Sequence, residues 1–312
     1  MKKVFIDGYA GTTGLKIYER LSSRKDIQLL TLTEETRKDI NARKDALNEA
    51  DIAFLCLPDD AAKESVSLVD NPNTAIIDTS TAHRVNDEWI YGLPELDGRR
   101  EKIKLSKRVA NPGCHATGFI VLVAPLVQNG LLNPDAELSC FSLTGYSGGG
   151  KKMIAQYEDA SRNPLLDAPR QYGISQAHKH LPEMVKVCGL KKSPVFCPIV
   201  ADYYAGMEVT ITLHADQVNG KIADLKECYR NYYHDGLIYF TENDDFDEKG
   251  FISAGAFAGR DDLEVSVYGN DERILLVSRF DNLGKGASGA AIQNMNILLG
   301  VDEKTGLNVG QL

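Results

Sequence analysis

Residues 2–21 read KKVFIDGYAGTTGLKIYERL, and this stretch decides the fold of the first half of the chain. The apolar run over residues 3–7 predicts a strand, and the spacing of Leu15, Ile17 and Leu21 predicts a helix. The turn between them contains Gly8, Gly11, Thr12, Thr13 and Gly14. Glycines let the backbone approach a phosphate, which the free N–H groups of a helix N-terminus bind. The spacing is G-x-x-G-x-x-G rather than the usual G-x-G-x-x-G, but its place at the first βα turn predicts a dinucleotide site.

Strand and helix patterns continue to alternate after this turn. Predicted strands lie at 27–32, 52–57 and 75–78, with a helix ending near residue 50 and another over 60–69. The run at 52–57 is apolar almost throughout, which is typical of strands buried on both faces of a parallel sheet. We therefore expect an α/β domain over residues 1–113, with a Rossmann-like, doubly wound parallel sheet.

The end of the second predicted strand leaves two cofactors possible. Thr33 is followed by Glu34 and Glu35, and an acid at this point can bind the ribose hydroxyl of NAD. Arg37 is close by and can instead bind the 2′-phosphate of NADP.

Composition excludes several classes of protein. The 312 residues are 43% hydrophobic, which is too apolar for a disordered chain. The formal charge of −9 argues against non-specific binding to nucleic acid. The longest apolar run, 119–127, is too short to cross a membrane, and the first residues lack the apolar core of a signal peptide. The six cysteines form no C-x-x-C pair, so we expect reduced thiols and a cytoplasmic protein.

The second half of the chain has a different pattern of predicted helices and strands. Apolar residues at helical spacing predict a helix over 114–129, which Pro125 is expected to kink, and another over 288–299. Alternating residues predict longer strands at 137–144, 195–199, 208–213, 263–269 and 273–281. We expect a second, α+β domain over 114–284, built on a mostly antiparallel sheet. The C-terminal segment 285–312, with its helix, is expected to return to the first domain.

Asn111-Pro112-Gly113-Cys114 is the most informative stretch for chemistry. A Pro-Gly turn places Cys114 at the start of the predicted helix, where free N–H groups and the helix dipole stabilise a thiolate. The same N–H groups can stabilise an oxyanion, so we predict that Cys114 is a nucleophile. The other five cysteines are expected to be structural: Cys56, Cys140, Cys188, Cys197 and Cys228.

A thiolate that attacks acyl compounds needs a general acid or base, and His178 and His180 are the best candidates. No cysteine or third histidine lies near them in sequence, so no metal site is expected. His115 adjoins the cysteine but is expected to point away from it.

Two further glycine-rich turns can bind anions. In the first, Ser147, Gly148 and Lys151 are candidates for the substrate. The second precedes the last helix, and its N–H groups are candidates for the cofactor's diphosphate or amide. Its members are Asn282, Gly284, Lys285 and Gly286.

Four motifs in fixed order give the chain a family resemblance. They are NPGC at 111–114, GYSGGGK at 145–151, HKHLPE at 178–183 and NLGKGASG at 282–289. Together they resemble the short bacterial form of the N-acetyl-γ-glutamyl-phosphate reductases, which are related to aspartate-semialdehyde dehydrogenases. The resemblance spans essentially the whole chain. It departs from the longer form of the family at DTSTAHR (78–84), which leaves the role of His83 open.

The resemblance implies an NADP-dependent reduction in arginine biosynthesis. Cys114 would attack an acyl phosphate and release phosphate, leaving a thioester for reduction to N-acetylglutamate semialdehyde. It implies that His178 is the acid–base residue, with His180 as the alternative. Arg84, Asn111, Ser147, Gly148 and Lys151 would bind the substrate, and Ser80 the cofactor. A homodimer or homotetramer is expected.

Three alternatives remain at this point. Another phosphorylating semialdehyde dehydrogenase, such as one acting on aspartate semialdehyde, would use the same chemistry. A non-catalytic NADPH-binding regulator would keep the fold without needing a reactive thiol. A cysteine hydrolase would have no use for the dinucleotide loop at Gly8–Gly14.

Overall fold

A computed structural model describes residues 1–242 and 250–310. The chain divides into two compact units. The first contains residues 1–112 and 287–307, and the second contains residues 113–286 together with the C-terminal residues from 308. The backbone carbonyl of Asn308 accepts the N–H of Asp261, and the backbone N–H of Asn308 donates to the Asp261 carboxylate. These bonds attach Asn308 to the second unit, whereas the first domain predicted from sequence extends to residue 312.

A parallel sheet of six strands forms the centre of the first unit, in the order β2-β1-β3-β4-β6-β5. Every neighbouring pair in this sheet is parallel. The strands are β1 (Lys2–Asp7), β2 (Ile27–Leu30), β3 (Ile52–Leu55), β4 (Ala75–Asp78), β5 (Ile90–Tyr91) and β6 (Arg108–Ala110). The order reverses direction on either side of β1, so the prediction of a doubly wound sheet is confirmed.

Both faces of this sheet are covered, because successive residues of each buried strand point to opposite sides. Val4 and Ile6 pack on one face with α1 (Thr12–Leu21), α4 (Arg99–Leu105) and α9 (Gly289–Leu299). Phe5 packs on the other face with α2 (Ile40–Glu49) and α3 (Asp59–Ser67). Continuous apolar runs such as Ile52–Leu55 follow from this two-sided burial.

The second unit is built on a mixed sheet of seven strands, in the order β11-β12-β13-β10-β7-β9-β8. These are β7 (Ser139–Gly145), β8 (Arg170–Gln171), β9 (Val195–Ala201), β10 (Met207–His214), β11 (Ile238–Phe240), β12 (Leu263–Gly269) and β13 (Arg273–Phe280). Most pairs are antiparallel, as predicted. The pairs β7–β9 and β11–β12 are parallel. The chain between β7 and β9 contains β8, α6 (Gly150–Glu158) and α7 (Leu181–Cys188), which is long enough for the crossover that a parallel pair requires.

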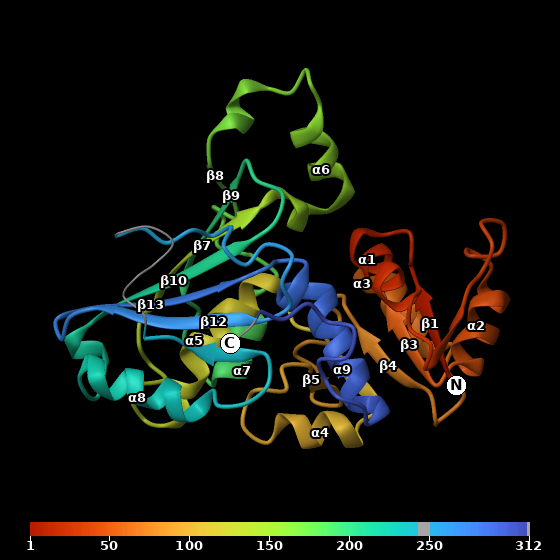
Figure 1. Ribbon diagram of the computed structural model, residues 1–312, viewed down its shortest axis with the longest axis horizontal. Helices are drawn as coiled ribbons and strands as arrows, with labels where there is room; N and C mark the ends of the chain where they lie inside the picture. The colour runs from red at the N-terminus through yellow and green to blue at the C-terminus, as the bar shows by residue number, and fades with distance from the viewer. Residues whose placement is uncertain (243–249, 311–312) are drawn as a thin grey trace. The chain divides into compact units, whose positions relative to one another are not determined.

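Helix α5 (Cys114–Gln128) is the central helix of this unit. It is apolar nearly all round, as a helix buried on all sides must be. It packs against β10 and β13, and Figure 1 shows α7 and α8 (Ile222–Tyr232) beside it on the same face of the sheet.

Pro125 lies inside α5, yet the helix continues unbroken to Gln128. A proline has no N–H, so the carbonyl four residues earlier loses its helical partner. The hydroxyl of Tyr233 donates to that carbonyl, on Val121, at 2.7 Å. The lost hydrogen bond is therefore replaced from outside the helix.

Gly118 lets α5 approach the sheet closely. A Cβ at this position would lie 2.4 Å from Cγ2 of Val209, and 2.9 Å from Oγ of Ser278. We expect Gly118→Ala to lower the free energy of unfolding by about 1–3 kcal/mol, as overpacked cores do. Urea denaturation measures the change. Gly255→Ala is the matched control because its Cβ would meet nothing closer than 3.5 Å, and equal stability of both variants would contradict this packing.

In the part of the chain that the structure describes, no helix is long and apolar enough to cross a membrane.

Candidate active site

The glycines in the glycine-rich turn of the first unit have two different roles: some are required by the packing of the chain, and one leaves the start of a helix open. Gly8 has a φ of +88°, and a Cβ there would lie 2.4 Å from the carbonyl oxygen of Cys56. A Cβ at Gly14 would lie 2.5 Å from the Gly8 carbonyl oxygen, so the packing of the chain itself requires both glycines. Gly11 has no such restriction, since its Cβ would meet nothing within 3.5 Å. It precedes α1 without a side-chain cap, which leaves the N-terminus at Thr12 and Thr13 open to an anion.

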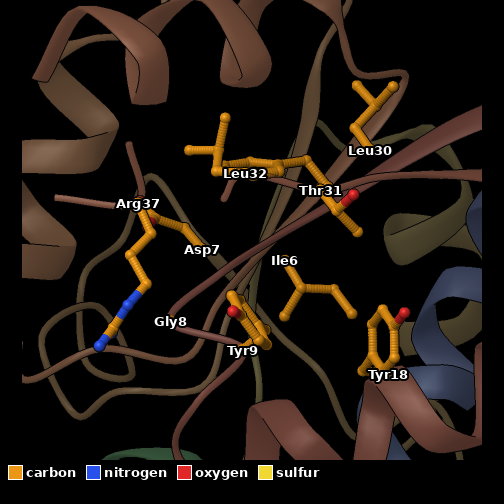
Figure 2. A pocket seen from close by; sticks show the side chains of 10 residues that line it. Ile6, Asp7, Gly8, Tyr9, Tyr18, Leu30, Thr31, Leu32 and Arg37 are labelled. Atoms are coloured by element: carbon orange, nitrogen blue, oxygen red, sulfur yellow. The ribbon is translucent and has the colours of Figure 1, made fainter. Parts of the chain in front are cut away.

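A pocket lies beside this turn, at the carboxyl ends of β1 and β2. Figure 2 shows Ile6 and Leu32 on its walls, with Tyr9 and Arg37 among the other lining residues. The Arg37 guanidinium pairs with Glu34 at 2.6 Å, and the Tyr9 hydroxyl donates to the same carboxylate. These two contacts lower the pKa of Glu34, the tyrosine having the larger effect. Arg37, the candidate for the 2′-phosphate, therefore lines the pocket, and Glu34, a candidate for the ribose, is paired with it. Thr33, next to them, bonds through its side chain to Thr36.

A second polar group follows β4 in the same unit. The Ser80 hydroxyl donates to Asp78 at 2.7 Å, and Nδ1 of His83 lies 2.6 Å from the same carboxylate. Arg84 donates to the carbonyls of Thr79 and Asn111. The structure thus brings Ser80, Arg84 and Asn111, all predicted site residues, into one hydrogen-bonded group at the carboxyl edge of the sheet, where α/β sheets bind ligands.

In the second unit, Cys114 is the first residue of α5, as predicted. Its side chain is half-buried, and Gly113 before it is extended and supplies no side-chain cap. The N–H of Gly113 donates to the carboxylate of Glu183 at 3.2 Å. A Cβ at Gly286 would lie 2.9 Å from Cβ of Cys114, so this glycine keeps one side of the cysteine open.

Histidine and aromatic rings gather next to this helix start. The ring centroids of His178 and His180 lie 4.7 Å apart, and that of His115 lies 5.7 Å from the first and 5.6 Å from the second. Phe196 and Tyr172 pack against the same rings. His115 was not expected to belong to the site, but its ring lies among those of His178 and His180, because partners on two other segments hold both of its ring nitrogens.

These partners are Ser142 on β7 and Tyr172, the residue after β8. Nδ1 of His115 lies 2.6 Å from Oγ of Ser142, and Nε2 lies 2.6 Å from the Tyr172 hydroxyl. Burial, helped by the nearby His178, lowers the pKa of His115 to about 3. His115 is therefore neutral at physiological pH.

His178 and His180 differ in their hydrogen bonds. Nδ1 of His178 accepts the backbone N–H of His180 at 3.2 Å, so Nε2 carries the proton when this ring is neutral. Nε2 of His180 lies 4.0 Å from Glu183, whose carboxylate is only 1% exposed.

The turn that contains Ser147 and Gly148 is fixed by hydrogen bonds within the second unit. The amide of Asn282 donates to Oγ of Ser147 at 2.9 Å and accepts the N–H of Gly206. Asn282 is a predicted cofactor residue, and the structure shows that its side chain supports the turn of Ser147. Lys151 is exposed in the first turn of α6.

The turn before α9 differs from the prediction that its N–H groups are open. The Asp281 carboxylate accepts from the N–H groups of Leu283 and Gly284, and the Asp281 carbonyl accepts that of Gly286. Lys285 is fully buried. Asp281 thus accepts the N–H groups of Gly284 and Gly286, two of the four residues predicted for the cofactor.

Sequence analysis did not identify Ser142, Tyr172 and Glu183 as members of this site. Glu183 belongs to the HKHLPE motif, so its position in this motif could have identified it as a site residue. Ser142 and Tyr172 are 27 and 57 residues from His115, and no local pattern connects them.

A parallel nucleotide-type sheet joined to a unit with a cysteine at a helix start defines a class of dehydrogenase. Residues 3–106 match the family model of the semialdehyde dehydrogenase NAD binding domain, and residues 114–282 match that of the semialdehyde dehydrogenase dimerisation domain. This class consists of oxidoreductases, and the matched NAD binding domain implies a nicotinamide cofactor.

The names of similar curated proteins specify the family further within this class. The chain is 42% identical to N-acetyl-gamma-glutamyl-phosphate reductase 2 of Nostoc, over 98% of this chain and 99% of the relative. It is 44% identical to the protein of the same name from Pseudomonas putida, over 95% and 96%. The chain belongs to the N-acetyl-gamma-glutamyl-phosphate reductases of the semialdehyde dehydrogenase family.

Solved structures agree on the fold. An aspartate semialdehyde dehydrogenase II from Vibrio cholerae, complexed with ASA, has a TM-score of 0.72 at 15% identity, covering 96% of this chain and 98% of that one. An aspartate semialdehyde dehydrogenase with NADP from Candida albicans has a TM-score of 0.66 at 15% identity, covering 95% and 98%.

Proposed function

We propose that this chain reduces N-acetyl-γ-glutamyl phosphate to N-acetylglutamate γ-semialdehyde with NADPH, releasing phosphate, as a step of arginine biosynthesis. The observation that carries the proposal is Cys114 at the N-terminus of α5, beside His178 and His180. The identity to reductases of this name over nearly the whole chain supports the choice of substrate.

Cys114 acts as the nucleophile. Its sulfur forms a bond to the γ-carbonyl carbon while the bond from that carbon to the phosphate oxygen breaks, and phosphate leaves with the electron pair. The acyl group is then held as a thioester on Cys114. Covalent catalysis of this kind divides one difficult step into two easier ones. The first N–H groups of α5 stabilise both the thiolate and the oxygen that gains charge.

The two histidines have different roles in the reaction. His178 donates a hydrogen bond from Nε2 to the oxygen of the reacting carbonyl, since its Nδ1 is already occupied by the His180 N–H. His180 takes the proton of the thiol, because Glu183 stabilises the imidazolium that results. The sulfur recovers this proton when the aldehyde leaves.

The substrate carries a carboxylate and a phosphate, and both need donors. Arg84 and Lys151 supply positive charge, and Asn111, Ser147 and Gly148 supply polar and backbone groups. Arginine suits either anion because its guanidinium binds it in two places. These five assignments rest on the family motifs and on the polar groups described above.

The first unit holds the cofactor, which supplies a hydride when bound. Gly8, Gly11, Thr12, Thr13 and Gly14 bind its diphosphate, since Gly11 leaves the start of α1 uncovered. Arg37 in the adjacent pocket binds the 2′-phosphate, which makes NADP the cofactor. Thr33, Ser80, Asn282, Gly284, Lys285 and Gly286 stay predictions for the rest of the cofactor. In domain terms, residues 1–113 with 285–312 bind NADP, and 114–284 carry catalysis.

The sheet of the second unit provides a surface for assembly. The face opposite α5 exposes Phe141 on β7, Val195 on β9 and Leu275 on β13, each at least 40% accessible, and β10 lies between β7 and β13. We propose that this face forms the interface of a homodimer. A homotetramer would contain two such dimers. We also place the protein in the cytoplasm, where the pathway belongs and where six cysteines without a disulfide are expected.

The reverse reaction tests this function. With phosphate and NADP, we expect formation of reduced cofactor from N-acetylglutamate semialdehyde with a kcat/KM at least 100-fold above that for aspartate semialdehyde, because the site would bind the N-acetyl and longer chain. NAD in place of NADP is the control for the cofactor. Equal or better use of aspartate semialdehyde would contradict the proposed substrate, and NADPH binding without turnover of either would indicate a regulator.

A further inference from the structure

We propose that Ser142 fixes the tautomer of His115 and thereby makes the Tyr172 hydroxyl a hydrogen-bond donor directed at the Cys114 site. Ser142 and His115 are then positioning residues, because they act through Tyr172. The inference rests on the proposed function only for its kinetic consequence. The tautomer itself is a property of the protein without substrate.

The three side chains form a continuous chain of hydrogen bonds. Each link, from Ser142 Oγ to His115 Nδ1 and from His115 Nε2 to the Tyr172 hydroxyl, measures 2.6 Å. Ser142 is 0% exposed and His115 is 4% exposed, so water does not replace either partner. Burial also keeps His115 neutral, with a pKa of about 3. A neutral imidazole has one nitrogen that donates and one that accepts.

Counting protons selects one of the two possible arrangements. Among the described residues, the Ser142 hydroxyl has no hydrogen-bond partner other than His115. If Nδ1 donated to Ser142, the serine proton would be buried without an acceptor, which costs about 1–3 kcal/mol. If Ser142 donates to Nδ1 instead, Nε2 carries the ring proton and donates to Tyr172. The one donor left over is then the hydroxyl of Tyr172, whose side chain is only half-buried, and not that of the fully buried Ser142.

The consequence falls on Tyr172. Its oxygen accepts from His115, so its own proton is available for another acceptor. Burial raises the pKa of Tyr172 well above its ordinary value, and the nearby Cys114 thiol raises it further, so the phenol stays protonated. The hydroxyl therefore donates towards the sulfur of Cys114 or an oxygen of the acyl group bound there. A hydrogen bond to a thiolate favours the charged form.

Nitrogen NMR of ¹⁵N-histidine-labelled protein tests the tautomer without substrate. We expect His115 to carry its proton on Nε2 in the wild type and in Ser142→Thr, which keeps the hydroxyl. Ser142→Ala removes the hydroxyl that donates to Nδ1, and we expect it to give a mixture of tautomers. His115→Phe identifies the signals by their loss. A wild-type proton on Nδ1 would overturn the proposal.

Kinetics test the effect on Cys114. We expect Ser142→Ala to lower kcat about tenfold with an unchanged KM for NADPH, in line with the loss of one hydrogen bond. Ser142→Thr should restore kcat. In a Tyr172→Phe background, Ser142→Ala should cause no further loss, because both act through the same hydroxyl.

Ser278→Ala is the matched control. Ser278 is a buried serine of the same sheet, and its hydroxyl donates to the Gly118 carbonyl rather than to His115. It should lose similar stability while keeping the tautomer and kcat. Additive losses of Ser142→Ala and Tyr172→Phe would overturn the proposal. If the tautomer is as expected but no semialdehyde is turned over, the proposed function fails and the inference about His115 stands.

Discussion

Cys114→Ser is expected to lower kcat by roughly 10³-fold or more, because a serine hydroxyl at this position is a much weaker nucleophile than a thiolate. The fold should be unaffected. The two side chains have nearly the same shape, and Cys114 is only half-buried, so the free energy of unfolding should change by less than about 1 kcal/mol. Steady-state rates, urea denaturation and NADPH fluorescence titration measure the three quantities.

Cys228→Ser is the matched control for this experiment. Cys228 is another half-buried thiol of the second unit, and burial raises its pKa, so it is a poor nucleophile. Its replacement should leave kcat within about twofold, as a substitution away from the reacting groups does. Turnover near the wild-type level in Cys114→Ser would rule out the covalent route.

His178→Ala is expected to cause the second largest loss, about 10²–10³-fold in kcat, which is typical for removal of an oxyanion donor. His180→Ala should lose less, because Cys114 keeps the stabilising N–H groups of α5 when the proton acceptor is gone. Neither variant should change the affinity for NADPH. Parallel measurements of kcat and of NADPH binding separate these effects.

An exposed histidine provides the reference for both variants. His234 contacts only the backbone carbonyl of Asn231 among the described residues, and His234→Ala should behave as the wild type. If His180→Ala loses more activity than His178→Ala, the two assignments must be exchanged. Equal and small losses would remove both residues from the reaction.

Strands β1 to β4 of the first unit could be predicted because their signals are local. Each is a short apolar run closed by glycine or polar residues, and the run Ala75–Asp78 is found with the predicted limits. Strands β5 and β6, of two and three residues, are too short to give such a signal and were not predicted. The parallel pairing of β7 and β9 could not be predicted, because 49 residues separate the end of β7 at Gly145 from the start of β9 at Val195. Strand direction across such a distance depends on tertiary packing.

The same distinction applies to the site. The position of Cys114 at the start of a helix was predicted because a Pro-Gly turn before a helix is visible in the sequence. The surroundings of His115 were not predicted, since they depend on Ser142 and Tyr172, which only the folded sheet brings near. The turn after Asp281 shows a third case: its glycines suggested open N–H groups, but an aspartate at the start of a turn bonds to those groups itself.

The central claim is that Cys114 carries the acyl group of the substrate. Intact-protein mass spectrometry after mixing the enzyme with N-acetyl-γ-glutamyl phosphate, without reduced cofactor, tests it most directly. We predict a mass increase of one N-acetylglutamyl group per chain, located on the peptide that contains Cys114, released by hydroxylamine and absent in Cys114→Ser. An unmodified Cys114 in an enzyme that reduces this substrate at its full rate would contradict the claim.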